Sequence, residues 1–294
     1  MARPKLVFFG FSMAGAEVLR QLLLDGANVA AVYTYEDNPS ENWFESVKKI
    51  AVENKIPVFT PEKIERADIE NIAKIKPEII LSVYYRSLLP DEVLKLAPRG
   101  AYNIHGSYLP KYRGRAPVNW VLVNGEKYTG ATLHYMTAKA DAGDIVDQEK
   151  VEIKFEDNAL TLTKKVSAAA RRIIKYSLKK LENGPAAGKP QDMSESTYFG
   201  RRTPEDGQIN WEWDALKIYN LIRAVTKPFP GAFTYLPDGR KMLIWKAKIL
   251  DGNAAASFGG FGWKNWDIKQ DVPFIMKTGT KDLQILDYEI VKGD

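Results

Sequence analysis

The sequence of 294 residues contains no cysteine. Without thiols the chain cannot form disulfides, hold zinc through thiolates or use a cysteine nucleophile. Histidine is nearly as scarce, because His105 and His134 are the only two. We therefore expect no multi-histidine metal site and no metal cofactor. Any catalytic chemistry must come from other side chains or from these two imidazoles.

Long apolar runs are also missing. No stretch approaches the roughly 20 apolar residues that cross a bilayer, and the run at residues 6–11 is too short for the core of a signal peptide. Hydrophobic residues make up 45% of the chain and the net charge is only +5, a combination typical of a folded globule. We therefore expect a soluble cytoplasmic protein with no membrane partner. The small basic excess suits anionic ligands without choosing among them.

In the first half, short apolar runs alternate with segments that have the 3.6-residue period of helices. The predicted strands cover residues 5–9, 29–35, 56–59, 78–84, 131–135 and 145–153. The predicted helices cover residues 13–24, 41–53 with Ser40 as the cap, 62–75, 117–124 and 160–181. Strands separated by helices pair in parallel through right-handed crossovers, so the pattern predicts an α/β fold with an open, mostly parallel sheet.

The composition changes after residue 182. Residues 183–207 are rich in Gly, Pro, Ser and charge, which is typical of a linker. A predicted helix at 215–225 is followed by short strand-like runs at 232–236, 241–249, 274–277 and 283–291. This pattern indicates a small closed β domain. We place the two domains at residues 1–203 and 204–294.

Two polar side chains stand out at the predicted sheet. Asn103 and His105 are two residues apart, so on an extended strand they point to the same side. Ligands of open α/β sheets bind beyond the carboxyl ends of the strands, and residues 10–15, 84–89 and 103–105 should share that rim. An amide donor beside an imidazole fits a reaction that develops an oxyanion and moves one proton. A purely structural role for such a polar pair stays open at this point.

A wider pattern surrounds this pair. Residues 103–110 read Asn-Ile-His-Gly-Ser-Tyr-Leu-Pro, and residues 139–144 read Lys-Ala-Asp-Ala-Gly-Asp. Together they resemble the signature of the folate-dependent formyltransferases, which include enzymes acting on methionyl-tRNA, glycinamide ribonucleotide and sugar nucleotides. The resemblance is strongest to the enzymes that act on UDP-4-amino-4-deoxy-L-arabinose, through residues 84–86, 111–125 and 199–204. It implies a Rossmann-like formyltransferase domain followed by a small OB-like β-barrel.

The resemblance also implies roles for single residues. The amine of the acceptor would attack the formyl group of 10-formyltetrahydrofolate, used as co-substrate. Asn103 would stabilise the oxyanion, His105 would move the proton, and Asp141 would orient His105 and favour its charged form. The folate contacts implied are Ser87, Leu88, Leu89, Arg115, Thr137, Ala138, Lys139 and Ala140. We interpret His134 as structural, and for Arg201 and Arg202 a role in nucleotide binding and a surface role both stay open.

Residues 35–42 narrow the range of possible acceptor substrates. This short segment carries Glu36, Asp37 and Glu41. The tRNA enzymes have a basic insertion there and an uncharged residue in place of Arg115. Since nucleic-acid binding depends on basic side chains, the resemblance favours a nucleotide-linked amino sugar, in the first place UDP-4-amino-4-deoxy-L-arabinose. Methionyl-tRNA and dTDP- or GDP-linked amino sugars are the alternatives.

Three further expectations complete the interpretation. The dehydrogenase domain that some arabinose enzymes carry is not expected, because the sequence ends at Asp294. Assembly into a homo-oligomer is left open. A non-catalytic protein that binds nucleic acid would need aromatic side chains among basic ones on its β domain, and Trp245, Trp263 and Trp266 offer little of that.

Overall fold

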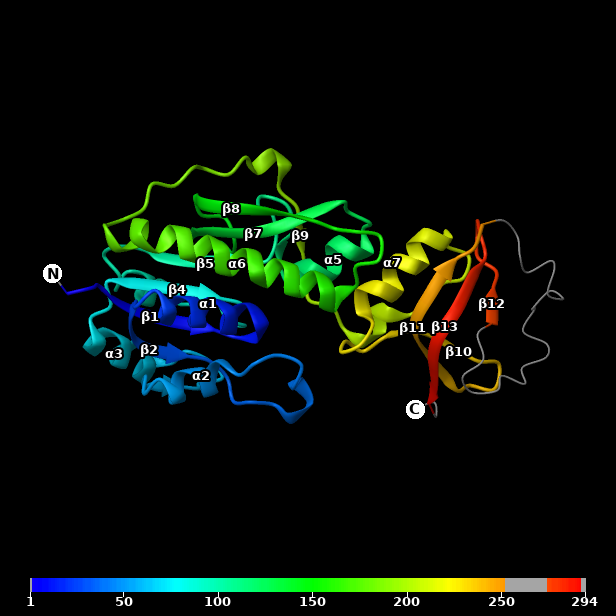
Figure 1. Cartoon of the computed structure of the whole chain (residues 1–294), viewed down its shortest axis with the longest axis horizontal. Coiled ribbons are helices and arrows are strands. Elements are labelled where there is room, and N and C mark those ends of the chain that lie inside the picture. The colour runs from blue at the N-terminus through cyan, green and yellow to red at the C-terminus, as the bar shows by residue number, and fades with distance from the viewer. Residues whose placement is uncertain (1, 252–273, 292–294) are drawn as a thin grey trace. The chain divides into compact units, whose positions relative to one another are not determined.

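The computed structural model describes residues 2–251 and 274–291. Trp263 and Trp266 lie outside these ranges. The chain divides into two compact units (Figure 1). The first contains Met1–Pro117, Tyr128–Glu152 and Thr163–Phe199, and the second contains Val118–Lys127, Ile153–Leu162 and Gly200–Asp294.

A seven-stranded sheet organises the first unit, in the order β3-β2-β1-β4-β5-β7-β8. The strands are β1 (Lys5–Gly10), β2 (Asn28–Tyr33), β3 (Val58–Phe59), β4 (Ile79–Val83), β5 (Ala101–His105), β7 (Tyr128–Tyr135) and β8 (Ile145–Glu152). The first five pair in parallel, and β7 and β8 are antiparallel to their neighbours. The prediction of an open, mostly parallel sheet is confirmed.

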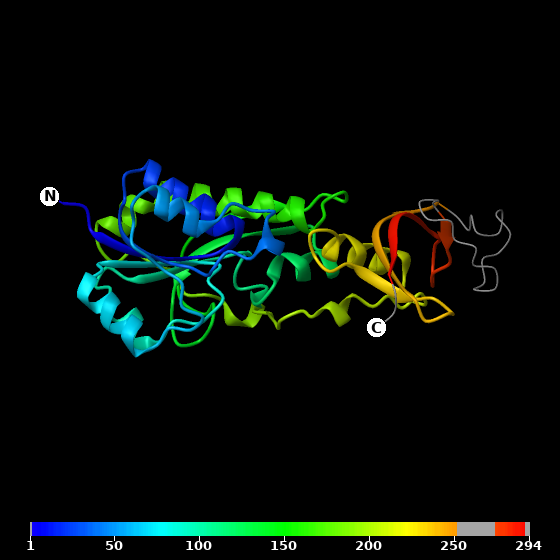
Figure 2. The ribbon, with the colours of Figure 1, turned by 90° about the horizontal axis from the view of Figure 1, so that it is seen from below.

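Helices cover both faces of this sheet. They are α1 (Ser12–Leu24), α2 (Val47–Glu53), α3 (Arg66–Ile75), α4 (Asp91–Leu94) and α6 (Ala159–Glu182). Figure 2 shows α1 and α6 on one side of the sheet and α3 on the other. On the α3 side, Val7, Phe9 and Ile80 of the sheet join Ile72 of α3 and Val93 of α4 in one buried cluster. In residues 2–251 and 274–291 we find no helix with the length and apolar character needed to span a bilayer.

The predicted start of the second helix is wrong. Ser40 lies in a 3₁₀ turn at Pro39–Glu41, and α2 begins only at Val47. The cap is Ser46, whose hydroxyl accepts a hydrogen bond from the Lys49 amide at 3.0 Å. Both serines have the side chain that a helix start requires. Ser46 is the cap because no residue between it and Ser40 is buried, and the buried residues Val47, Ile50 and Ala51 begin directly after it.

The carboxyl ends of β1, β4 and β5 lie side by side, as predicted. Leu6–Gly10 of β1 pairs with Ile79–Val83 of β4, and Ile80–Val83 pairs with Ala101–Ile104 of β5. The Phe11 amide extends this pairing with a hydrogen bond of 3.1 Å to the Val83 carbonyl. The segments that follow these three strands therefore share one rim of the sheet.

The second unit is built on an antiparallel sheet of order β10-β11-β13-β12. Its strands are Ala232–Tyr235, Lys241–Ile249, Leu283–Val291 and Phe274–Met276 in that order, and α7 (Ala215–Val225) buries Ile218, Leu221 and Ile222. α5 (Pro117–Val123) lies against α7, since the Asn119 amide donates to the Ala224 carbonyl at 2.7 Å. The closure of this sheet into an OB-like barrel and the boundary at residues 203 and 204 stay predictions.

The sheet core offers a direct test of stability. Ile80 is fully buried in β4, whereas Leu24 at the end of α1 is 71% exposed. We expect Ile80→Ala to lower the free energy of unfolding by about 2–5 kcal/mol, because the change removes buried methyl groups and leaves a cavity. The free energy of unfolding of Leu24→Ala should stay within about 0.5 kcal/mol of the parent value. Urea unfolding followed by circular dichroism measures both, and equal losses would contradict the burial described.

Candidate active site

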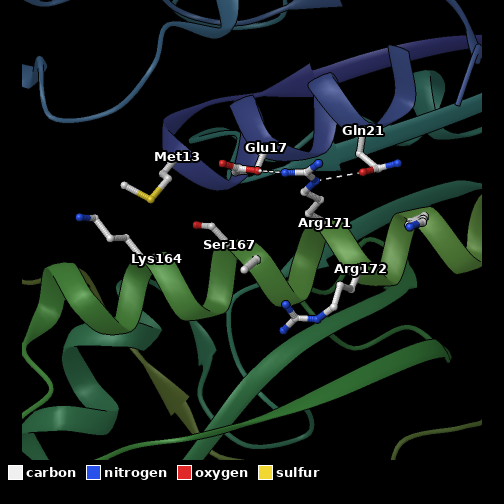
Figure 3. A pocket seen from close by; sticks show the side chains of 9 residues that line it. Met13, Glu17, Gln21, Lys164, Ser167, Arg171 and Arg172 are labelled. Atoms are coloured by element: carbon white, nitrogen blue, oxygen red, sulfur yellow. Dashed lines mark hydrogen bonds and ion pairs between the residues drawn. The ribbon is translucent and has the colours of Figure 1, made fainter. Parts of the chain in front are cut away.

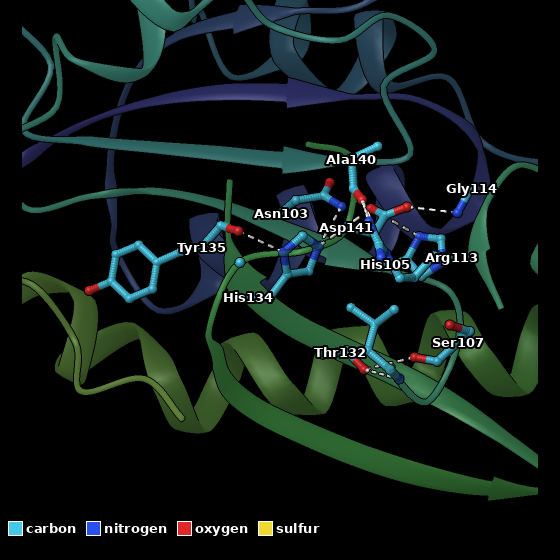
Figure 4. Close-up of polar contacts among 12 residues, drawn as sticks. Asn103, His105, Ser107, Arg113, Gly114, Thr132, His134, Tyr135, Ala140 and Asp141 are labelled. Atoms are coloured by element: carbon cyan, nitrogen blue, oxygen red, sulfur yellow. Dashed lines mark hydrogen bonds and ion pairs between the residues drawn. The ribbon is translucent and has the colours of Figure 1, made fainter. Parts of the chain in front are cut away.

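A polar cluster occupies the rim at the end of β5 (Figure 4). Asn103 and His105 lie on the same side of β5, as the strand period predicts. Because β7 is antiparallel to β5, Asn103 stands directly opposite His134, and His105 opposite Thr132. Asp141, which follows β7 in the chain, completes the cluster. The three residues assigned from the resemblance, Asn103, His105 and Asp141, thus come together in space. His134 lies beside them.

The Asp141 carboxylate joins the cluster. One of its oxygens, Oδ1, lies 3.6 Å from His105 Nδ1 and 3.6 Å from His134 Nε2. The other, Oδ2, accepts a hydrogen bond of 2.9 Å from the Gly114 amide. Burial by itself would raise the pKa of Asp141, but the charge of His105 and the hydrogen bond from the Gly114 amide hold that pKa well below its ordinary value. The group is therefore an anion at neutral pH.

Both ring nitrogens of His105 face acceptors. Nε2 lies 2.8 Å from the Tyr112 carbonyl, and Nδ1 faces Asp141. A carbonyl oxygen only accepts, so Nε2 must carry a hydrogen. A neutral ring would then turn a lone pair toward the carboxylate, whereas an imidazolium donates in both directions. The arrangement suits a residue that is charged during part of a reaction, and the ring is only 7% exposed.

A short pair of strands positions the main-chain partners of this cluster. β6 (Arg113–Gly114) pairs in parallel with β9 (Tyr198–Phe199). The Arg113 amide donates to the Thr197 carbonyl at 2.9 Å, and the Arg115 amide donates to the Phe199 carbonyl at 2.9 Å. These bonds fix the segment from which the Tyr112 carbonyl contacts His105 and the Gly114 amide contacts Asp141.

Gly114 is required at its position. Its φ of +96° lies in the region that favours glycine, and a Cβ there would come within 2.2 Å of the Phe199 carbonyl oxygen. Next to it, the buried Arg113 guanidinium donates from Nε to the Ala140 carbonyl at 3.2 Å. The main chain directly before Asp141 is therefore also held by a hydrogen bond.

His134 is where prediction from the sequence falls short. Its Nδ1 lies 2.8 Å from the Tyr135 carbonyl, and its Nε2 lies 3.1 Å from Asn103 Nδ2. The ring is 1% exposed. The interpretation of His134 as structural stays a prediction, and its place opposite Asn103 could not be read from the sequence, because it depends on the antiparallel register of β5 and β7. The signal available in the sequence was that both histidines fall within one 30-residue stretch around the same motif.

The predicted folate contacts lie on two segments beside the cluster. Ser87, Leu88 and Leu89 follow β4, and Leu88 is 74% exposed. Ser87 Oγ lies 3.4 Å from the Tyr35 hydroxyl, which donates to it. Arg115 is also exposed, and its Nη2 donates to the Arg86 carbonyl at 3.4 Å. Leu88 and Arg115 are therefore accessible at the rim, whereas Ser87 is half-buried and Leu89 packs against the buried cluster on the α3 side of the sheet.

The second segment runs from Thr137 to Ala140. The Thr137 hydroxyl donates to the Lys139 carbonyl at 2.9 Å, which closes a tight turn, and Ala138 lies within that turn. Ala140 contributes its carbonyl to Arg113. The segment leads directly into Asp141. The binding of folate by either segment stays a prediction.

Two cavities are found away from the polar cluster. One of about 370 Å³ lies between α1 and α6 (Figure 3). In this cavity Arg171 donates hydrogen bonds to Gln21 and Glu17 of α1. The other, about 250 Å³, is lined by Phe11, Phe44 and residues between 37 and 46. In the described part of the chain, no group of three or more His, Asp or Glu side chains could hold a metal ion.

Comparison with known proteins identifies the family of this chain. Residues 5–178 match the formyl transferase family, and residues 201–293 match the formyl transferase C-terminal domain. The chain belongs to the formyl transferase family, and it is an enzyme that transfers formyl groups.

Solved structures with the same fold include several sugar-modifying enzymes. The N-formyltransferase of Helicobacter canadensis, in complex with folinic acid and dTDP-3-aminofucose, is 22% identical over 96% of this chain and 99% of its own, with a TM-score of 0.74. WlaRD, a sugar 3N-formyl transferase studied with dTDP and 5-N-formyl-THF, is 20% identical over 97% and 98%, with a TM-score of 0.73. HypX of Aquifex aeolicus, in complex with tetrahydrofolic acid, is 17% identical over 97% of this chain and 44% of its own, with a TM-score of 0.65.

The depressed pKa of Asp141 predicts a dependence of stability on pH. Its folded pKa lies below the unfolded value of about 3.9. The carboxylate therefore stabilises the fold above that unfolded value, and the contribution is lost as the pH falls through the folded pKa. We expect the stability advantage of the parent over Asp141→Asn to be present at pH 5 and to shrink as the pH falls from about 4 toward 2.

Urea unfolding at a series of pH values measures that advantage. Asp287→Asn, which removes an exposed carboxylate on β13, serves as the control. An advantage that grows on acidification would mean that Asp141 is not held as an anion by its neighbours.

Proposed function

We propose that the enzyme transfers the formyl group of 10-formyltetrahydrofolate to the amine of a nucleotide-linked amino sugar. The observation that carries this proposal is the cluster of Asn103, His105 and Asp141 at the rim of the sheet, in a member of the formyl transferase family. UDP-4-amino-4-deoxy-L-arabinose is the acceptor that the sequence resemblance favours.

The reaction needs an oxyanion stabilised and one proton moved. When the acceptor amine attacks the formyl carbon, a carbon–nitrogen bond forms and the formyl oxygen becomes an oxyanion. The Asn103 amide would donate a hydrogen bond to that oxygen, an effect worth about 10²–10³ in rate per donor. Collapse of the intermediate breaks the bond to the folate nitrogen, which must gain a proton, while the attacking amine must lose one.

His105 is the group that would carry this proton. Its imidazolium form is matched by the Tyr112 carbonyl on Nε2 and by Asp141 on Nδ1. To transfer a proton, His105 Nε2 must give up its hydrogen bond to the Tyr112 carbonyl and form one to the reacting nitrogen instead. Asp141 stays an anion throughout, because its pKa is held low, and so it stabilises the imidazolium while the proton is in transit.

The rim beside this cluster suits the two substrates. Main-chain groups of Ser87, Leu88 and Leu89 and of residues 137–140 would take the pterin ring, whose edge alternates donors and acceptors. The exposed Arg115 guanidinium offers a planar pair of donors for an anionic group. Structures of the same fold include proteins described with folates and with dTDP or a dTDP-linked amino sugar, which supports the assignment of both substrate classes.

Replacing either member of the acid–base pair should abolish turnover without preventing folate binding. We expect His105→Asn and Asp141→Asn each to lower kcat by at least about 100-fold, because they remove proton transfer in the transition state. The Kd for folinic acid, measured by fluorescence titration, should change by less than about threefold. Asp91→Asn, an exposed change on α4, is the control. Near-native kcat in either variant would refute the assigned roles.

The acceptor specificity can be tested directly. Residues 35–42 carry three carboxylates and no Lys or Arg. Glu36 pairs with Lys48 and Glu41 pairs with Arg86, so nearby cations are already engaged. We expect kcat/KM for methionyl-tRNA to be at least about tenfold below that for UDP-4-amino-4-deoxy-L-arabinose, since phosphate binding needs free basic side chains.

A mass-spectrometric assay with both acceptors, and with dTDP- and GDP-linked amino sugars, measures the preference. Efficient formylation of the tRNA alone would replace the proposed function by that of a methionyl-tRNA formyltransferase. Formylation of a different amino sugar would keep the substrate class and change the sugar.

A further inference from the structure

His134 is buried beside the reacting groups, and the roles proposed above leave it without a function. It stands on β7 directly opposite Asn103 on β5, and its side chain is 1% exposed. Three atoms surround its ring nitrogens. The Tyr135 carbonyl lies 2.8 Å from Nδ1, while Asn103 Nδ2 and Asp141 Oδ1 lie 3.1 and 3.6 Å from Nε2 (Figure 4).

These contacts fix the tautomer of the neutral ring. The Tyr135 carbonyl can only accept, so Nδ1 carries the hydrogen and Nε2 presents a lone pair. Asp141 Oδ1 has no hydrogen to offer, and 3.6 Å exceeds the length of a hydrogen bond. The partner of the Nε2 lone pair is therefore the NH₂ group of Asn103.

This bond decides which way the Asn103 amide points. The oxygen and nitrogen ends of a carboxamide have nearly the same size, so packing alone barely distinguishes them. A lone pair on His134 Nε2 accepts the NH₂ end and repels the oxygen. The NH₂ group has two hydrogens, and with one of them on His134 the other stays available as a donor.

We infer that His134 is a positioning residue, which holds the Asn103 amide with its NH₂ group as the donor toward the oxyanion of the proposed reaction. This inference rests on the proposed function for its kinetic consequence, while the tautomer and the hydrogen bond stand without it. A flipped amide would turn its oxygen toward the developing negative charge and so oppose the reaction.

The kinetic test separates His134 from a residue that only fills space. His134→Leu removes the acceptor, whereas His134→Gln can keep an oxygen near the position of Nε2. With the amino sugar that the parent enzyme formylates, we expect His134→Leu to lower kcat by about tenfold or more. This is part of the ~10²–10³ that one oxyanion donor contributes. KM for both substrates should stay within about twofold, and His134→Gln should recover most of kcat.

A double-mutant cycle with Asn103→Ala measures whether His134 acts on kcat through Asn103. Once the amide is gone, His134→Leu should change kcat by less than about twofold, since nothing remains to be oriented. Thr129→Val is the matched control, because Thr129 lies on the same strand, is 2% exposed and has a hydroxyl without a hydrogen-bond partner. Multiplicative losses in the double variant, or a native kcat in His134→Leu, would overturn the inference.

A second measurement does not depend on activity. The chain has only two histidines, so the ring ¹⁵N shifts of the parent can be assigned by comparison with His134→Gln. We expect His134 to be a neutral Nδ1–H tautomer with an unprotonated Nε2. An Nε2–H tautomer would refute the inference even if the enzyme formylates amino sugars. An Nδ1–H tautomer in a protein that formylates no amino sugar would instead count against the proposed function alone.

Discussion

The buried charge of Asp141 is the constraint on which the site depends. A carboxylate removed from water is costly unless other groups replace its solvation. Here the Gly114 amide donates a hydrogen bond to the carboxylate, and the His105 ring lies beside it. Three separate parts of the chain, the end of β5, the β6 strand and β7, must therefore meet at one anion. The fold of the first unit can be understood as the frame that brings them there.

The position of the cluster follows from how the sheet changes direction. Between β1 and β5 every strand is parallel, so their carboxyl ends open on one rim. β7 then runs the opposite way, which places Asn103 and His134 as direct neighbours across two strands. Such cross-strand neighbours lie close enough for their side chains to interact. The mixed sheet thus provides both an open rim for substrates and a close pair of polar side chains.

Local patterns predicted much of this architecture, and non-local contacts account for what they missed. The apolar runs of β1, β2 and β4 and the period of α1 are readable because each pattern is complete within a few residues. The same holds for Asn103 and His105, which share a side of one strand. The partners Tyr112, Gly114 and His134 were not predictable, because their contacts depend on strand register and on the two-residue pairing of β6 with β9. Ser40 and Ser46 were equally good candidates for the helix cap, because the sequence does not show which residues are buried.

The pairing of β6 with β9 bears on how the sequence can diverge. The groups that it presents to His105 and Asp141 are the Tyr112 carbonyl and the Gly114 amide, both main-chain atoms. The Tyr198 side chain is exposed, so replacing it leaves these atoms in place, whereas the buried Tyr112 ring stacks on Phe199 and helps to hold the pair together. Inserting or deleting one residue between 112 and 114 would shift the strand by about 3.3 Å. Such a shift would also place a main-chain amide where the Tyr112 carbonyl now contacts the His105 imidazole. The number of residues between 112 and 114 therefore determines which main-chain groups reach His105 and Asp141.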